Sequence, residues 1–140
     1  MYASLMGTRS LGEEIRLRTF SDDLGSLTVV EPEIDIDFEI KRVYYLHSLS
    51  PEALRGGHAH RQLTQLMVPI SGSFTLILEM HHESKTIEAA DPRVGYLIPP
   101  MTWRDIRNFS PGAVCMVLAS ARFDEKDYIR EKQEYLASFA

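Results

Sequence analysis

The 140-residue chain contains a single cysteine, Cys115, which excludes an intrachain disulfide. A chain that is stable without disulfides suits a reducing compartment. Cys115 lies in the apolar run 113–118, and apolar surroundings raise the pKa of a thiol. We therefore expect a buried, unreactive thiol in a cytoplasmic protein.

Long hydrophobic runs and an excess of positive charge are also missing. No apolar stretch approaches the roughly 20 residues that cross a bilayer, and the N-terminal residues form no signal-like hydrophobic segment. The net charge of -5 argues against a general nucleic-acid surface. We expect a protein that binds neither membrane nor nucleic acid, with local arginines and lysines still available for a small anion.

The composition is that of one compact domain over residues 1–140, with 44% hydrophobic and 25% charged residues. Short segments separated by turn signals predict strands over residues 15–20, 26–31, 40–46, 65–71, 73–79, 85–89, 93–98, 103–108 and 113–120. Short strands at this spacing predict an all-β fold, a sandwich or barrel of jelly-roll type. Residues 124–138 are rich in helix formers and predict one C-terminal α-helix.

His58 and His60 form an H-x-H pair. Side chains alternate across a strand, so on a strand both imidazoles would lie on one face. Imidazole titrates closest to neutral pH, and two converging rings indicate either a metal site or a proton-transfer site. The other three histidines, His47, His81 and His82, fit no such pattern and are expected at the surface.

The histidine pair opens a longer pattern, H-x-H-x4-Q-x6-G, which runs through Gln65 to Gly72. A second block runs from Gly95 through Arg104 to Asn108. The two blocks resemble the two cupin motifs, which in metal-binding members supply three His and one Glu to a divalent ion. Gln65 and Arg104 stand at two of those four positions, and a cationic guanidinium would repel the ion. We therefore expect a site without metal or other cofactor.

More narrowly, the chain resembles the metal-independent cupin sugar-nucleotide 3,4-ketoisomerases, a WxcM-like family. The matching positions cover most of the chain and are residues 25–27, 41–45, 55–60, 65, 72–73, 91–95, 100–103, 117–120 and 124–130. The resemblance implies an enzyme that moves the keto group of a dTDP-linked 4-keto-6-deoxyhexose from C4 to C3 through an enediol, in deoxyamino-sugar biosynthesis.

This reaction takes a proton from C3, returns one to C4 and exchanges a proton between the two oxygens. Two adjacent imidazoles can do this without metal or redox cofactor. The resemblance implies that His58 and His60 are the proton shuttle. We favour His60 as the carbon base and His58 as its partner at oxygen, with the roles interchangeable. Tyr44 is expected to hold the pair or to donate to the enediolate, while Tyr45 faces the other way.

The substrate-binding residues are expected to be Arg42, Arg55, Gln65, Trp103 and Arg104. A forked guanidinium suits phosphate oxygens, so Arg42 and Arg55 would bind the diphosphate. Gln65 would bind a histidine or a sugar hydroxyl, and Trp103 would form a pocket wall for the sugar or base. Family members carry His or Arg at the position of Arg104, and Arg implies a gluco-type rather than a galacto-type product.

Two other functions remain open at this point: a non-catalytic nucleotide-sugar-binding cupin and a metal-dependent cupin enzyme. Nucleotide-sugar binding that survives loss of either histidine would identify the first, and metal analysis would identify the second. Small cupins commonly pair through their sheets, and pairing covers edge strands, so we expect a homodimer.

Overall fold

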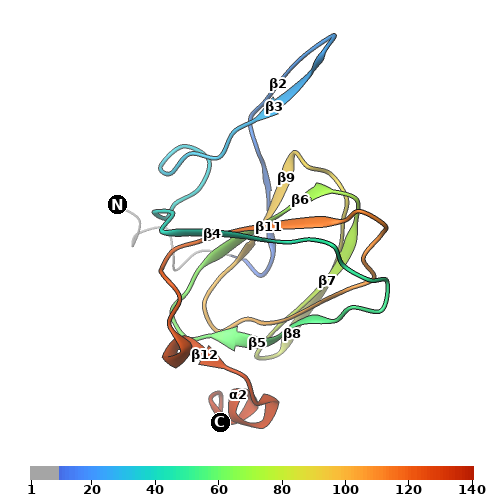
Figure 1. Cartoon of the computed structure of the whole chain (residues 1–140). Coiled ribbons are helices and arrows are strands. Elements are labelled where there is room, and N and C mark those ends of the chain that lie inside the picture. Colours follow the sequence, from blue (N-terminus) through green and yellow to red (C-terminus); the bar gives the residue numbers. More distant parts are fainter. Residues whose placement is uncertain (1–9) are drawn as a thin grey trace.

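The computed structural model describes residues 10–140 and shows a β protein with a short helix at its C-terminal end (Figure 1). Its strands are Glu13–Arg16 (β1), Thr19–Asp22 (β2), Gly25–Thr28 (β3), Arg42–Leu46 (β4), Arg55–His60 (β5), Gln65–Ser71 (β6), Phe74–Met80 (β7), Glu83–Ala89 (β8), Val94–Ile98 (β9), Trp103–Arg107 (β10), Val114–Ala119 (β11) and Tyr128–Ile129 (β12). The helical segments are a 3-10 turn at Glu125–Asp127 (η1) and the α-helix Lys132–Ala137 (α2).

Ten of these strands form two five-stranded antiparallel sheets. One sheet has the order β1-β9-β6-β11-β4, and the other has the order β12-β5-β10-β7-β8. Neighbours such as β6 and β11 are far apart in the sequence, as in a jelly roll, where strands cross repeatedly between two sheets. The predicted all-β jelly-roll barrel is confirmed.

The main core lies between the two sheets. Met67, Val117 and Ile98 contribute from the first sheet, and Leu76 and Ile106 contribute from the second. Each is almost completely buried, and burial of such a side chain stabilises the fold by about 1.5–3 kcal/mol. Cys115 belongs to this core, where burial raises the pKa of its thiol to about 12, so it is the buried thiol expected from the sequence.

Part of the outer face of each sheet is covered as well. The segment before β4 places Ile36 and Phe38 against Leu66 and Leu118 of the first sheet. Strand β6 is therefore buried on both faces over most of its length, which explains why its residues 66–70 are an uninterrupted apolar run instead of an alternating one. On the second sheet, the corresponding cover is the C-terminal segment.

That C-terminal segment differs from the predicted helix over residues 124–138. Tyr128 and Ile129 instead pair with His60 and Ala59 and extend the second sheet as β12, and only Lys132–Ala137 is α-helical. Helix propensity is a weak preference that pairing with a sheet edge can override. The prediction of an α-helix was wrong for residues 124–131, of which 125–127 form the 3-10 turn, and this correction places the segment beside the histidine pair.

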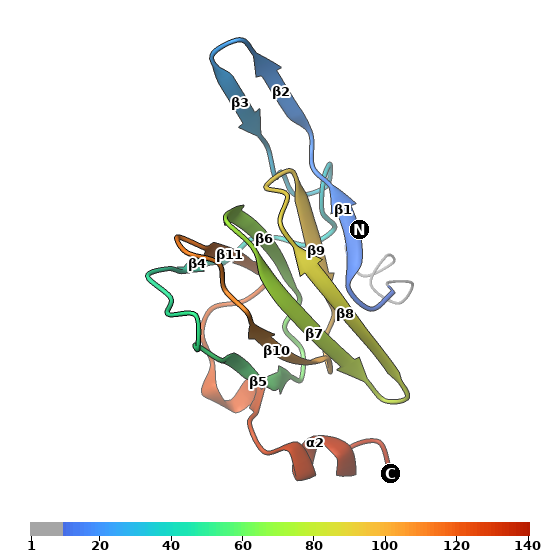
Figure 2. The ribbon, with the colours of Figure 1, turned by 90° about the vertical axis from the view of Figure 1, so that its right-hand side faces the viewer.

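The predicted strand over residues 15–20 is also divided in two. Strand β1 pairs with β9 of the first sheet, whereas β2 pairs only with β3 and forms a hairpin that projects away from both sheets (Figure 2). Hydroxyl side chains pair on one face of the hairpin, with Thr19 and Thr28 oxygens 2.9 Å apart. Phe20 and Leu27 are exposed on the hairpin, by 61% and 60%.

Within residues 10–140, no helix combines the length and the apolar character needed to cross a bilayer. The expected surface position of His47, His81 and His82 is confirmed, because all three are exposed.

Candidate active site

A cavity of about 380 Å³ opens between the sheets at the end formed by β4, β5 and β10. Its walls also include residues of β6 and β11 and of the C-terminal segment. The polar residues that line it are Arg42, Tyr44, Arg55, His58, Arg104, Tyr128 and Arg130. None of the described residues lining the cavity is acidic, so its electrostatic character suits an anionic ligand.

The histidine pair lies on β5, and both rings are on the same face as the sequence predicts. The ring centroids of His58 and His60 are 4.9 Å apart, and the rings are nearly perpendicular. His58 lines the cavity, whereas His60 is 1% exposed and lies deeper. The two imidazoles therefore have different access to a ligand.

Two consecutive glycines shape the strand before the histidine pair. Arg104 pairs with His58 and Asp105 pairs with Gly56, so Gly57 is an extra residue that forms a bulge. Gly56 has a φ of +84°, and a Cβ atom there would lie 2.7 Å from the backbone oxygen of Arg104. The close approach of β10 requires glycine at this position and sets where the following imidazoles lie.

Both imidazoles are held in the neutral form. Burial, with a smaller contribution from the Arg104 guanidinium, lowers the pKa of His58 to about 4. The same two causes lower the pKa of His60 to about 2. The Nδ1 atom of His58 lies 3.1 Å from the carbonyl oxygen of Gly56, which can only accept a hydrogen bond. A neutral His58 therefore carries its proton on Nδ1 and presents an unprotonated Nε2.

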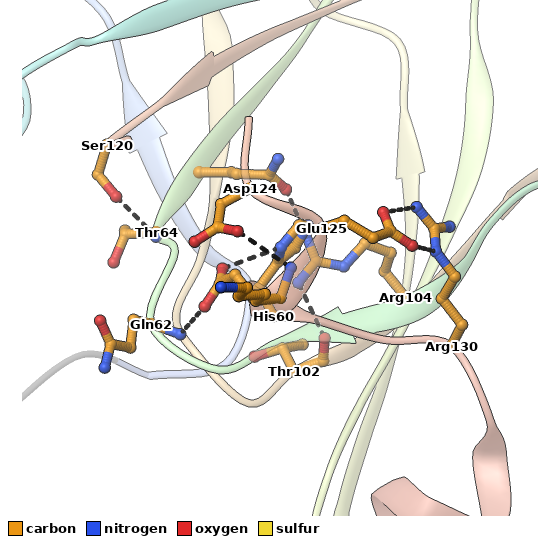
Figure 3. A network of polar contacts seen from close by, with 12 residues as sticks. His60, Gln62, Thr64, Thr102, Arg104, Ser120, Asp124, Glu125 and Arg130 are labelled. Carbon is orange, nitrogen blue, oxygen red and sulfur yellow. Dashed lines mark hydrogen bonds and ion pairs between the residues drawn. The ribbon is translucent and has the colours of Figure 1, made fainter. Parts of the chain in front are cut away.

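Gln65 connects Arg104 to Tyr44. Arg104 donates from Nη1 to the Oε1 atom of Gln65. It also donates from Nη2 to the carbonyl oxygen of Thr102, 2.9 Å away (Figure 3). Because guanidinium only donates, the oxygen of the Gln65 amide must face Arg104 and its nitrogen must face Tyr44. That nitrogen donates to the Tyr44 hydroxyl oxygen over 3.0 Å. The Tyr44 proton is consequently free to be donated into the cavity.

Burial is the largest cause of the pKa shifts of Arg104 and Tyr44. Burial lowers the pKa of Arg104 to about 10, so the group is still cationic at neutral pH. Burial also raises the pKa of Tyr44, so its phenol stays protonated. Arg104 is 1% exposed, and its hydrogen bonds go to an amide and a carbonyl instead of a carboxylate. Its positive charge is therefore available to a charge that develops in the cavity.

Arg42 and Arg55 lie at the rim of the cavity. The Arg42 guanidinium is 5.3 Å from the centre of the Tyr44 ring, and its Nε atom has no hydrogen-bond partner among the described residues. Arg55 is exposed and begins β5. Tyr45, which follows Tyr44 on β4, is 62% exposed and faces away from the cavity as predicted.

Trp103 does not line the cavity, which corrects its predicted role as a pocket wall. Alternation along β10 places Trp103 and Arg104 on opposite faces of the sheet, so only one of them can face the interior. Trp103 packs instead in the outer cluster with Ala59, Ile129 and Tyr135. Its ring centre lies 5.4 Å from that of Tyr135 on α2. Gln65 is likewise absent from the lining, and its amide contacts the lining residues Arg104 and Tyr44.

Three residues of the C-terminal segment reach the site without having been predicted there. Tyr128 covers the histidine pair, with ring centres 4.9 Å from His58 and 4.2 Å from His60. The Arg130 guanidinium lies 4.1 Å from the centre of the Tyr128 ring, and Asp127 contacts His60. The family resemblance includes residues 124–130, which was a signal for function, but the predicted C-terminal helix gave no reason to place these residues beside the histidine pair.

At the positions of the two missing cupin ligands, Gln65 and Arg104 bind each other. Within residues 10–140, no group of three or more His, Cys, Asp or Glu side chains is arranged to hold a metal ion.

Known proteins resemble this chain in sequence and in fold. Residues 12–140 match the family described as FdtA: WxcM-like, C-terminal. The TDP-4-oxo-6-deoxy-alpha-D-glucose-3,4-oxoisomerase of Aneurinibacillus thermoaerophilus is 39% identical over 121 residues, which are 86% of this chain and 87% of that protein.

Three solved structures extend the comparison. QdtA, a sugar 3,4-ketoisomerase from Thermoanaerobacterium thermosaccharolyticum in complex with TDP, is 40% identical, with a TM-score of 0.88 and coverage of 90% of this chain and 92% of that one. A His-to-Asn mutant of QdtA has been solved with TDP-4-keto-6-deoxyglucose. The WlaRB TDP-quinovose 3,4-ketoisomerase from Campylobacter jejuni is 39% identical, with a TM-score of 0.86 and coverage of 89% of this chain and 96% of that one.

Proposed function

The chain belongs to the WxcM-like, C-terminal family, and from this premise we propose that it moves the keto group of a dTDP-linked 4-keto-6-deoxyhexose from C4 to C3. It is a sugar-nucleotide 3,4-ketoisomerase, as are the relatives that match nearly all of its length. The observation that carries the proposal is the pair of imidazoles, 4.9 Å apart, of which His58 lines a cavity that four arginines also line. A neutral imidazole accepts a proton, and the arginines suit a diphosphate.

His58 is the carbon base in this proposal. Its unprotonated Nε2 accepts the proton from C3, the C4 carbonyl becomes an enediolate, and the same imidazolium later delivers the proton to C4. We therefore exchange the roles favoured from sequence, because His58 lines the cavity and His60 lies behind it. His60 is the second imidazole, which relays the proton that leaves the 3-hydroxyl to the former carbonyl oxygen.

The enediolate oxygen is stabilised by Tyr44 and Arg104. Tyr44 is protonated and its hydroxyl proton is free, since the oxygen already accepts from Gln65. Arg104 is cationic and has no carboxylate among its hydrogen-bond partners. Removing one such donor in other enzymes costs about 10²–10³ in kcat, so these groups supply a substantial part of the rate.

The nucleotide diphosphate binds at the rim. Arg42 and Arg55 flank the cavity mouth, and we add Arg130, which the C-terminal segment brings to the same cavity. The base is thymine, which the TDP complex of QdtA supports. The product has the gluco configuration at C4, a choice supported by Arg104 and by the similarity to a TDP-quinovose enzyme, since quinovose is 6-deoxyglucose.

The protein acts as a cytoplasmic homodimer. The hairpin of β2 and β3 supports pairing, because an isolated two-stranded hairpin is marginally stable in water and this one exposes Phe20 and Leu27. A second copy would cover that apolar face. The single buried Cys115 is compatible with a reducing compartment.

Proton NMR of dTDP-4-keto-6-deoxyglucose in deuterium oxide tests the proposal. The wild-type protein should exchange deuterium at the reacting carbons and produce the 3-keto sugar, and the coupling at C4 should be that of the gluco isomer. His58→Asn should abolish exchange and product, whereas the matched surface variant His82→Asn should behave as wild type.

Three results would contradict the proposal. Bound substrate without exchange above the spontaneous rate would indicate a non-catalytic binding protein. Activity that is lost on dialysis against EDTA and restored by a divalent metal would indicate a metal-dependent enzyme. Full activity of His58→Asn would remove the assigned base.

A further inference from the structure

Asp127 contacts the deeper histidine from a distant part of the chain. Its Oδ2 atom lies 3.2 Å from Nδ1 of His60, although the two residues are 67 positions apart. The His60 side chain is 2% exposed and the Asp127 side chain 19%. The contact is therefore nearly enclosed, and solvent screens it less than it screens a surface pair.

The position of the Asp127 carboxylate is fixed by the backbone that follows β5. Its second oxygen, Oδ1, accepts a hydrogen bond from the Gln62 amide at 2.8 Å. The carbonyl oxygen of Asp127 accepts another from the Arg61 amide at 2.8 Å. The side chain and the main chain of this one residue thus bind both residues that immediately follow His60.

The segment that carries Asp127 is itself held in place. The Asp124 side chain caps η1 by accepting from the Lys126 amide at 3.0 Å. Just after Asp127, the strand β12 pairs with β5, and an ion pair of 2.6 Å joins Glu125 to Arg130 (Figure 3). Asp127 therefore meets His60 as part of the folded structure instead of through a loose terminal tail.

The contact determines which nitrogen of His60 carries the proton. A neutral imidazole has one N–H, and a carboxylate only accepts hydrogen bonds, so the proton lies on Nδ1. The Nε2 atom is buried without a hydrogen-bond partner among the described residues. The ring cannot easily turn over, because Tyr128 covers it at 4.2 Å and His58 contacts it edge-on.

We propose that Asp127 is a positioning residue of the proton-transfer site: it holds His60 in the Nδ1–H tautomer and so leaves Nε2 free to accept a proton. The catalytic part of this inference rests on the proposed ketoisomerase function. The tautomer itself does not, and it can be measured without substrate. His60 and His58 then present the same nitrogen, Nε2, as a base, one through a carboxylate and the other through a backbone carbonyl.

The test replaces Asp127 by Asn in the full-length protein. The Asn oxygen can still accept from the Gln62 amide, but its NH2 group would face Nδ1 of His60 and donate to it. His60 should then change to the Nε2–H tautomer. The control is Asp124→Asn, the same chemical change in the same segment, because Asn caps a helix as well as Asp does. Asp127→Glu keeps the carboxylate and should restore part of the wild-type behaviour.

Two readouts are needed. Long-range proton–nitrogen NMR of protein labelled with ¹⁵N-histidine reports the tautomer, and His60→Asn identifies the His60 signals. In steady-state kinetics, Asp127→Asn should lower kcat by roughly 10²-fold, the size of a typical general-base contribution, and should change KM less than about threefold. Asp124→Asn should leave the tautomer and kcat unchanged.

The outcomes separate this inference from the proposed function. A wild-type His60 in the Nε2–H form would refute the positioning role without any variant, even if Asp127→Asn fails to fold. An active wild-type enzyme whose Asp127→Asn variant retains kcat would also refute it. An inactive wild-type protein whose His60 tautomer depends on Asp127 would refute the ketoisomerase function and leave the positioning contact intact.

Discussion

The orientation of the Gln65 amide predicts the effect of replacing it by Glu. A carboxylate at this position can still accept from Arg104, but it has no N–H to donate to Tyr44. The Tyr44 hydroxyl should therefore turn and donate its proton to the new carboxylate. The cavity then loses the hydrogen-bond donor that is proposed to stabilise the enediolate.

The expected decrease in kcat follows from the loss of one hydrogen-bond donor to the enediolate. Removing a preorganised donor to a developing oxyanion costs about 10²–10³ in kcat, or about 2.7–4 kcal/mol. Tyr44→Phe removes the same donor directly and should cost a similar factor. The proposed diphosphate ligands are Arg42 and Arg55, which neither variant changes, so KM should change little in either variant.

The assay is steady-state formation of the 3-keto sugar, measured for both single variants and for the double variant. If Gln65 acts through Tyr44, the double variant should lose little more than Tyr44→Phe alone. The exposed helix residue Gln133, changed to Glu, is the control for an added negative charge. Chemical unfolding of each protein checks that the fold is preserved.

Two results would refute this reasoning. Losses that multiply in the double variant would show that Glu at position 65 acts separately, by neutralising the charge of Arg104. A fully active Gln65→Glu variant would show that the free proton of Tyr44 is not needed.

Two further predictions concern pH and β5. The pKa of His58 is about 4 in the folded protein, against 6.5 for an unperturbed histidine, so between these values the unfolded chain binds more protons. The contribution of His58 to stability should be complete above pH 6.5 and decline as the pH falls toward 4, and His58→Asn should flatten this part of the unfolding-versus-pH curve. Activity should persist below pH 6 and fall near pH 4, and a half-loss near pH 6.5 would contradict a neutral buried base. Gly56→Ala should lower the free energy of unfolding in urea by about 1–3 kcal/mol and reduce kcat, because φ is +84° and the Cβ atom would meet the Arg104 backbone. The control is Gly25→Ala, which should be nearly neutral because no atom lies within 4 Å of the added Cβ.

Much of the fold could be predicted because strand signals are local. Alternating and apolar segments located most strands to within a few residues, and Gln65–Ser71 was predicted with its observed bounds. Alternation also predicted that His58 and His60 share a face and that Tyr44 and Tyr45 do not. Those relations need only the geometry of one strand, which is independent of the rest of the chain.

The C-terminal segment could not be predicted in the same way. The composition of residues 124–138 favours a helix, but Tyr128 and Ile129 gain hydrogen bonds by pairing with the edge of β5. Local propensity is worth a few tenths of a kcal/mol per residue and cannot report a partner that is distant in the sequence. The positions of Asp127, Tyr128 and Arg130 beside the histidines follow from that pairing.

The sequence by itself determined the jelly-roll class, the family and most of the polar residues that meet in the cavity. Only the tertiary structure decided which of them face it. Because side chains alternate along a strand, the sequence predicts that Trp103 and Arg104 lie on opposite faces. The packing of α2 on the outer face and the closure of the two sheets decide which face is interior. The same long-range packing places His58 at the cavity and His60 behind it, because burial depends on elements that are brought together only when the whole chain has folded.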